Sequence, residues 1–347
     1  IGLVGSEMCI RDRYQSWKFK VLSFFAMILV LYAHAYIPDA AQYKVFYIFE
    51  KSIAFCWGRL FFPLFFFISG YLFYVKLSDP DWSVWKQKYR SRVKSLLIPY
   101  IIWNILCLLQ MFILKYIPVA GKYMNSDYTQ LIHGGLWEWI YTLFIVPGGF
   151  HLWFIRDLIL IVVVSPFLYF CIRKMIFIYF PLIIFFSFYN SWFQSLTMFS
   201  IGAACAIYNI SLEVKLKHKW GLVLLGTASL LLMLYCSMIF IPGTKELYLV
   251  AILFLFVWFL YDYLYRKGWR FDFIKRWIPY TFFIYLFHIP ALSIVKKVML
   301  LVGRGEEWSC WITFLVSPFI MAAVAIWIGG LLKKYLPKLY SVLTGGR

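Results

Sequence analysis

Charged residues are scarce in this sequence. They make up 14% of the 347 residues, whereas a soluble globular domain carries about 25%. Hydrophobic residues make up 63% of the chain, and its mean hydropathy is +0.79. No water-soluble fold hides this much apolar surface, so the shortage of charge excludes a soluble globular protein. The sequence predicts an all-α, polytopic integral membrane protein with lipid as its main solvent.

Acidic residues are scarcer than basic ones. The 15 Asp and Glu residues face 34 Lys and Arg residues, which gives a formal net charge of +19. Such an excess is also typical of nucleic-acid-binding proteins. Here the basic residues lie between apolar runs, and membrane topology explains that placement better. No nucleic-acid partner is predicted.

The chain also lacks paired cysteines and internal repeats. Its seven cysteines are an odd number, and none belongs to a CxxC pair. Neither a disulfide framework nor a thiolate metal site is indicated, and no metal is expected. No repeat of about 20–50 residues is visible, and no inverted duplication of the kind seen in many transporters.

The two ends of the sequence differ from the rest. The first thirteen residues, IGLVGSEMCIRDR, are expected to be a non-native prefix, because they lack an initiator Met and are too short and polar for a signal peptide. Residues 14–335 are expected to form one transmembrane domain, and residues 336–347 a short basic cytoplasmic tail.

Ten apolar runs are long enough, or nearly so, to cross a bilayer, which takes about 20 helical residues. They lie near 21–38, 52–75, 95–114, 152–172, 175–190, 193–210, 220–241, 247–265, 279–299 and 309–332. A further apolar stretch from Leu136 to Gly149 is flanked by glycines. We interpret this stretch as a re-entrant or interfacial helix.

The basic residues predict the orientation of the ten helices. With the N-terminus placed inside, the inside segments hold 24 Lys and Arg residues and the outside segments hold 8. Basic loops resist translocation, so this bias favours ten helices with both termini in the cytoplasm.

Two ionisable residues lie inside the first two runs. His34 is roughly 21 Å beyond Lys20, and Arg59 roughly 12 Å beyond Lys51, at 1.5 Å per helical residue. The two side chains are thus predicted at similar depth, where ionisable groups are costly and usually functional. Alternatively, Arg59 extends to the headgroups and His34 makes a packing hydrogen bond.

Later runs carry four more candidates. GGFHLWFIRDLIL holds His151, Trp153 and Arg156 near the outer face. An interfacial histidine and a local ion pair between Arg156 and Asp157 explain the same residues without function. His288 lies near mid-membrane in FFIYLFHIPAL, where a proline two residues later weakens the helix and frees a carbonyl that a structural histidine could bind.

The loop from Lys76 to Lys94 carries a dense basic cluster. Its last nine residues hold Lys86, Lys88, Arg90, Arg92 and Lys94. A cytoplasmic anchor on anionic lipid explains the cluster. The alternative is a site for a polyanion, because guanidinium groups bind phosphates with directional hydrogen bonds.

Taken together, five segments resemble the membrane acyltransferase-3 family of polysaccharide and glycan O-acyltransferases, which includes fucose 4-O-acetylase-like proteins. In chain order they are VLYAHAY, RLFFPLFFFISGYLF, RVKSLLIPYIIWN, HLWFIRDLIL and FIYLFHIPAL. The resemblance runs from about residue 17 to 335. It implies ten helices with cytoplasmic termini, in the bacterial inner membrane.

The resemblance also implies substrates and site residues. The acyl donor would be acyl-CoA, usually acetyl-CoA, and the acceptor a hydroxyl of a glycan or lipid-linked saccharide. His34 matches the family's essential histidine, and Arg59 an arginine before the SGY element. Arg92, with Arg90 and Lys94, matches a basic cluster suited to the phosphates of CoA. Many members have a basic residue where this chain has Ser23, and Lys20 is the nearest basic residue here.

A mechanism follows as a hypothesis. His34 would act as the base that deprotonates the acceptor hydroxyl, and Arg59 would stabilise the developing oxyanion. A covalent acyl-histidine is the other route that these residues allow. Two different classes of protein stay open on the residues alone: a flippase or transporter of lipid-linked sugars, and a membrane scaffold.

Overall fold

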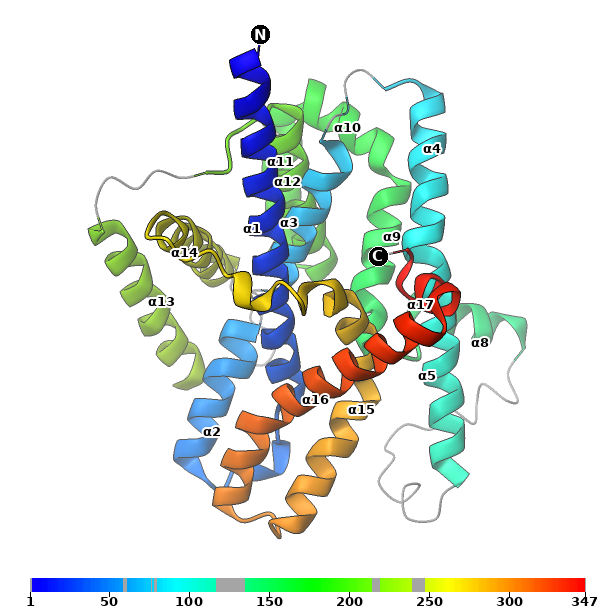
Figure 1. Ribbon diagram of the computed structural model, residues 1–347, viewed down its shortest axis with the longest axis vertical. Coiled ribbons are helices and arrows are strands. Elements are labelled where there is room, and N and C mark those ends of the chain that lie inside the picture. Colours follow the sequence, from blue (N-terminus) through cyan, green and yellow to red (C-terminus); the bar gives the residue numbers. More distant parts are fainter. Residues whose placement is uncertain are drawn as a thin grey trace. The chain divides into compact units, whose positions relative to one another are not determined.

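The computed structural model describes residues 2–58, 61–75, 77, 80–116, 135–213, 219–238 and 247–346. Across these ranges the chain is helical and contains no β-strand. It divides into two units, Ile1–Asp79 with Phe167–Val324, and Pro80–Pro166 with Ala325–Arg347. Figure 1 shows the helices coloured along the sequence.

The first unit holds most of the long helices. Its elements are α1 (Gly2–Ala35), η1 (Pro38–Ala40), α2 (Lys44–Lys51), η2 (Ser52–Trp57), α3 (Phe61–Tyr74), most of α10 (Ser165–Lys174), α11 (Ile176–Ser187), α12 (Ser191–Ile207), α13 (Trp220–Met238), α14 (Leu247–Arg266), η7 (Asp272–Ile274), η8 (Ile278–Tyr280), α15 (Thr281–Val302) and the first part of α16 (Glu307–Tyr335).

The closest helix pair in this unit is α3 and α12. Gly70 and Gly202 face the backbone of the opposite helix, and a Cβ at either position would lie far inside van der Waals contact with a carbonyl of Phe199 or Phe67. Only glycine permits this approach, as in other helix pairs packed through small residues. Helix α11 joins the pair through a hydrogen bond of 2.7 Å between the hydroxyls of Tyr179 and Ser200.

A buried ion pair joins α1 to α14. Lys18 Nζ lies 2.7 Å from Asp262 Oδ1, and the two side chains are 0% and 1% exposed. The ammonium group also lies 3.8 Å from the ring centre of Trp258, which adds a cation–π contact. The basic side chain buried near the start of the first apolar run is therefore Lys18, because Lys20 is exposed.

Helix α15 is broken in its middle. Ile289 has extended backbone angles, φ −111° and ψ 132°, and the segments on either side of it meet at 64°. The cause is Pro290, which disfavours the helical conformation of the residue before it and lacks the amide hydrogen for its own helical bond. The expected weakening of the ninth run is thus confirmed.

The second unit holds α4 (Trp82–Arg92), η4 (Val93–Leu97), α5 (Ile98–Tyr116), α8 (Leu136–Ile140), η5 (Tyr141–Ile145), η6 (Phe150–Leu152), α9 (Trp153–Val163) and α17 (Pro337–Thr344). The basic segment that we expected to be a loop is helical from Trp82 onward and continues through η4 into α5. Asp81 begins this helix, because its carboxylate accepts a hydrogen bond of 3.0 Å from the amide of Val84.

The stretch from Leu136 to Gly149 forms the first arm and the bend of a broken or re-entrant segment. Residues Leu136–Ile145 meet Phe150–Val163 at 65°. Asn104 of α5 holds the bend, because its amide donates to Leu143 O at 3.1 Å and accepts from Gly149 N at 3.3 Å. Gly148 packs closely against α5 at the bend, since a Cβ there would meet the side chain of Leu108.

Each of the ten apolar runs overlaps at least one helix. Three described helices are long and apolar enough to cross a membrane, namely Arg13–Ala35, Trp82–Gln110 and Glu307–Tyr335. The number is five if each of the two bent pairs counts as one span. The membrane class is therefore supported, whereas ten spans and the orientation of the termini stay predictions.

Candidate active site

His34 lies in the last turn of α1. The helix ends at Ala35 because Ile37 precedes Pro38, and the residue before a proline favours an extended conformation, here φ −116° and ψ 92°. Ala35 and Ile37 are buried in an apolar cluster with Phe46 of α2 and Phe314 of α16. The imidazole of His34 is partly exposed, at a helix end that this cluster holds in place.

The structure brings His34 together with His288. Their ring centres lie 5.1 Å apart at an interplanar angle of 48°. His288 belongs to α15, which contacts α1, and its side chain is 0% exposed. The orange α15 lies next to the lower part of the blue α1 in Figure 1. Two imidazoles from distant parts of the sequence thus share one site.

One hydrogen bond defines the protonation pattern of His288. Its Nδ1 lies 2.6 Å from the carbonyl oxygen of Tyr285, one turn earlier in α15. A carbonyl only accepts, so Nδ1 must carry the hydrogen, and Nε2 of the neutral ring is left as an acceptor. His288 is therefore both oriented and held in one tautomer, just before the break in its helix.

Two charged residues surround the end of α1. Lys296 Nζ donates to His34 O at 2.8 Å and to Tyr36 O at 2.7 Å. Glu50 of α2 is 0% exposed and accepts a hydrogen bond of 2.8 Å from the amide of Ile37. Neither residue could be assigned to the site from the sequence, because no local motif marks Lys296 or Glu50 as a neighbour of His34.

Arg59, the second catalytic candidate, lies outside the residues that the structure describes. Its expected proximity to His34 stays a prediction. The segment before it, η2, contacts α1, and Gly58 lies against Ala33. This contact places the chain close to the last turns of α1 immediately before Arg59.

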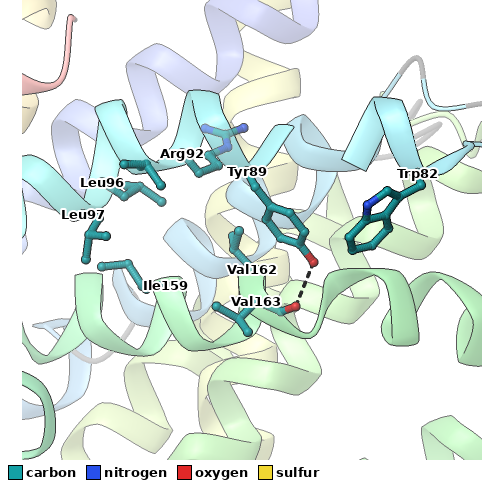
Figure 2. A pocket seen from close by; sticks show the side chains of 9 residues that line it. Trp82, Tyr89, Arg92, Leu96, Leu97, Ile159, Val162 and Val163 are labelled. Atoms are coloured by element: carbon teal, nitrogen blue, oxygen red, sulfur yellow. Dashed lines mark hydrogen bonds between the residues drawn. The ribbon is translucent and has the colours of Figure 1, made fainter. Parts of the chain in front are cut away.

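Arg92 lies in the second unit, where it lines an open groove of about 450 Å³. Figure 2 shows the groove between the segment Trp82–Leu97 and the helix α9, which contributes Ile159, Val162 and Val163. The hydroxyl of Tyr89 donates to Val163 O at 2.8 Å and so links the two walls. Arg90 and Lys94 are exposed, and neither lines this groove.

The other three candidates lie along the bend before α9. His151 is buried, Trp153 is partly exposed, and Arg156 forms an ion pair with Asp157 at 2.7 Å. Arg156 also donates to the carbonyl oxygen of Ile145. The local ion pair that the sequence analysis offered as a structural explanation is thus present, and Arg156 fastens the re-entrant segment to α9.

No group of three or more His, Cys, Asp and Glu side chains in the described part of the chain is arranged to hold a metal ion. The His34 site places two imidazoles beside an ammonium group. A neutral imidazole can accept a proton from a hydroxyl, which is the basis of general base catalysis.

Comparison with known proteins gives one match. The model of a family described as an acyltransferase domain, acyltransferase-3, matches residues 18–332. This range includes His34, His288, Lys296 and the groove beside Arg92. No curated protein and no solved structure matches the chain.

Proposed function

The chain belongs to the acyltransferase-3 family, and on that premise we propose that it is an integral-membrane O-acyltransferase that moves an acetyl group from acetyl-CoA to a hydroxyl of a surface polysaccharide or related glycan. The proposal places it in a bacterial inner membrane, with ten spans and cytoplasmic termini. The membrane class and acyl transfer follow from the helices and the family. The donor, the acceptor and the membrane are parts of the proposal.

The observation that carries this proposal is the pair of imidazoles, His34 and His288, whose ring centres are 5.1 Å apart. An alcohol is a poor nucleophile near neutral pH, and a positioned base removes that barrier. Ionisable side chains within membrane-spanning segments are costly, and such groups are retained mainly where they act. A transporter gives no comparable reason for a base with a second imidazole at its side.

In the proposed reaction His34 takes the proton of the acceptor hydroxyl as the oxygen attacks the thioester carbonyl. The C–S bond then breaks, the acyl group stays on the acceptor oxygen, and His34 returns the proton to the leaving thiolate. His288, held as the Nδ1–H tautomer, orients the acceptor or His34 through Nε2. Arg59 would stabilise the oxyanion of the intermediate, since a fixed cation acts strongly at a site of low dielectric.

The groove beside Arg92 suits part of a CoA thioester. Its walls are mainly apolar, and Arg92, Tyr89 and Trp82 contribute the polar side-chain atoms. An acyl-pantetheine arm would therefore find apolar contact, and a phosphate would find Arg92. Arg90 and Lys94, which are exposed on neighbouring turns, would add charge for the remaining phosphates. His151, Trp153 and Arg156 are proposed to line the acceptor side.

Replacing Arg92 with alanine is expected to raise the KM for acetyl-CoA about 10-fold or more, because a lost hydrogen bond to a charged group costs about 1.5–3 kcal/mol. The turnover number should change less, since Arg92 is not assigned to the reacting atoms. Steady-state kinetics on purified membranes measure both constants. Lys86→Ala removes an equal, exposed charge from the same helix and should leave KM within about twofold. Equal KM values for the two variants would contradict the role of Arg92.

The proposed function is tested by supplying labelled acetyl-CoA to membranes that contain the protein, and by following both free CoA and label in the glycan fraction. NMR of the glycan, with and without the protein, identifies the acetylated hydroxyl. We expect release of CoA in step with O-acetylation. Movement of a lipid-linked sugar without consumption of acetyl-CoA would favour the flippase alternative instead.

A further inference from the structure

The turn that carries His34 ends with backbone groups that the helix itself cannot satisfy. The last four carbonyls of an α-helix have no partner within the helix. At the end of α1 a single side chain, Lys296, donates hydrogen bonds to the carbonyl oxygens of His34 and Tyr36, at 2.8 and 2.7 Å. A cation is also favourable at a helix C-terminus because of the helix dipole.

A second side chain holds the next residue. Glu50 Oε1 accepts from Ile37 N at 2.8 Å, and its Oε2 is buried with no hydrogen-bond partner among the residues that the structure describes. Burial raises the pKa of Glu50 to about 8, against the opposite effects of the Ile37 amide and the Lys296 ammonium group. Either protonation state of a carboxyl keeps an acceptor oxygen, so the bond to Ile37 does not depend on ionisation.

The hydrogen bonds of Lys296 and Glu50 are directional, whereas the apolar packing beside them is not. The cluster of Ala35, Ile37, Phe46 and Phe314 buries apolar surface, and this stabilisation has no direction. Hydrogen bonds weaken steeply when donor and acceptor rotate out of line. The bonds from Lys296 and to Glu50 therefore add a directional restraint at the end of α1 that the apolar packing does not supply.

The break in α15 lets one helix hold His34 at two points. His288 precedes the break at Ile289 and meets the ring of His34, whereas Lys296 follows it and bonds to the backbone oxygen of His34. The segments on the two sides of the break differ in direction by 64°. Pro290 thus sets how α15 presents an imidazole and an ammonium group to the same residue.

We propose that Lys296 and Glu50 are positioning residues of the acyltransferase site, which hold the end of α1 so that the imidazole of His34 stays opposite His288. This inference rests on the proposed role of His34 as base. Neither residue is assigned contact with the acyl group or the acceptor. Both act through the backbone of residues 34–37.

The first test replaces Lys296 with methionine, which keeps the length of the side chain and removes the ammonium group. We expect the turnover number per folded enzyme to fall about 10- to 100-fold, because a small displacement of a reacting group costs on that order. The KM for acetyl-CoA should stay within about threefold. Lys296→Arg, which keeps the charge and the donors, should restore most of the activity.

The matched control is Lys297→Met, which removes the same charge from the exposed neighbouring position. This variant should keep wild-type turnover. The amount of folded protein is measured by size-exclusion chromatography in detergent, so that poor folding lowers the yield and not the turnover number. Equal losses in the two variants would show that charge near the outer face matters, and not the bonds to His34 and Tyr36.

Glu50 is tested with two substitutions. Glu50→Gln keeps an acceptor for the amide of Ile37 and should retain turnover within about threefold, since the bond does not need the charge. Glu50→Ala leaves that buried amide without its acceptor and should lower turnover about 10-fold, because the turn moves to give the unsatisfied amide another partner. A loss in Glu50→Gln as large as in Glu50→Ala would overturn the hydrogen-bond role.

A double variant separates this inference from the proposed function. If Lys296 acts only through His34, then adding Lys296→Met to His34→Ala should lower the residual rate no further. Full activity of His34→Ala would defeat the proposed function itself. Loss of activity in His34→Ala with wild-type turnover in Lys296→Met would defeat only the positioning role.

Discussion

Replacing His34 with alanine is expected to reduce acetyl transfer by about 100- to 10,000-fold, the range that a general base contributes. The reason is the loss of the proposed base, which would take a proton from the acceptor hydroxyl and return it to the thiolate. Binding of acetyl-CoA should persist, since the groove beside Arg92 is untouched. The measurement is release of CoA by purified protein with saturating donor and acceptor.

The control for this result is Tyr32→Phe. Tyr32 lies half a turn before His34 and donates to Leu315 O at 3.1 Å, so its loss probes the same helix without removing the imidazole. It should retain near wild-type turnover. Because His34 and His288 are proposed to act as a unit, the double alanine variant should be no worse than His34→Ala alone. Retained O-acetylation in His34→Ala would refute the assignment of the base.

The largest expected effect on stability comes from Gly70→Ala and Gly202→Ala. An alanine normally stabilises a helix interior by about 1 kcal/mol over glycine. At these two positions the added methyl group would overlap the backbone of the opposite helix, which has no rotamer with which to move away. The sign should therefore reverse, and we expect a loss of about 3 kcal/mol or more as α3 and α12 are forced apart.

Gly226→Ala in α13 is the matched control. Its nearest neighbour would be the ring edge of Phe256 at 3.0 Å, a side chain that can turn slightly. Thermal unfolding in detergent, followed by circular dichroism and by aggregation, should show lower midpoints for the first two variants and little change for Gly226→Ala. Similar midpoints for all three would show that the contact between α3 and α12 tolerates a wider spacing.

Helix formation can be predicted from the sequence because it is a local property. In a bilayer every backbone amide and carbonyl must be satisfied within its own segment, so an apolar run of sufficient length becomes helical whatever its neighbours are. Each predicted run overlaps a helix for this reason. The break in α15 was readable too, because Pro290 acts on its own amide and on the residue before it. The basic segment before residue 95 is the exception. Its dense charge is typical of a loop between spans, but the structure shows a helix that Asp81 caps.

The site too has features that depend on local sequence and features that depend on tertiary packing. The sequence by itself determined the membrane class, the helices and the family, since each of these depends on composition or on short motifs. It also predicts His34 as the candidate base. Only the tertiary structure decided that His288 faces that imidazole, that Lys296 and Glu50 hold its helix end, and that Lys18 pairs with Asp262. Those partners lie on other elements, and they meet because close packing, through contacts such as Gly70 against α12, selects which helices become neighbours.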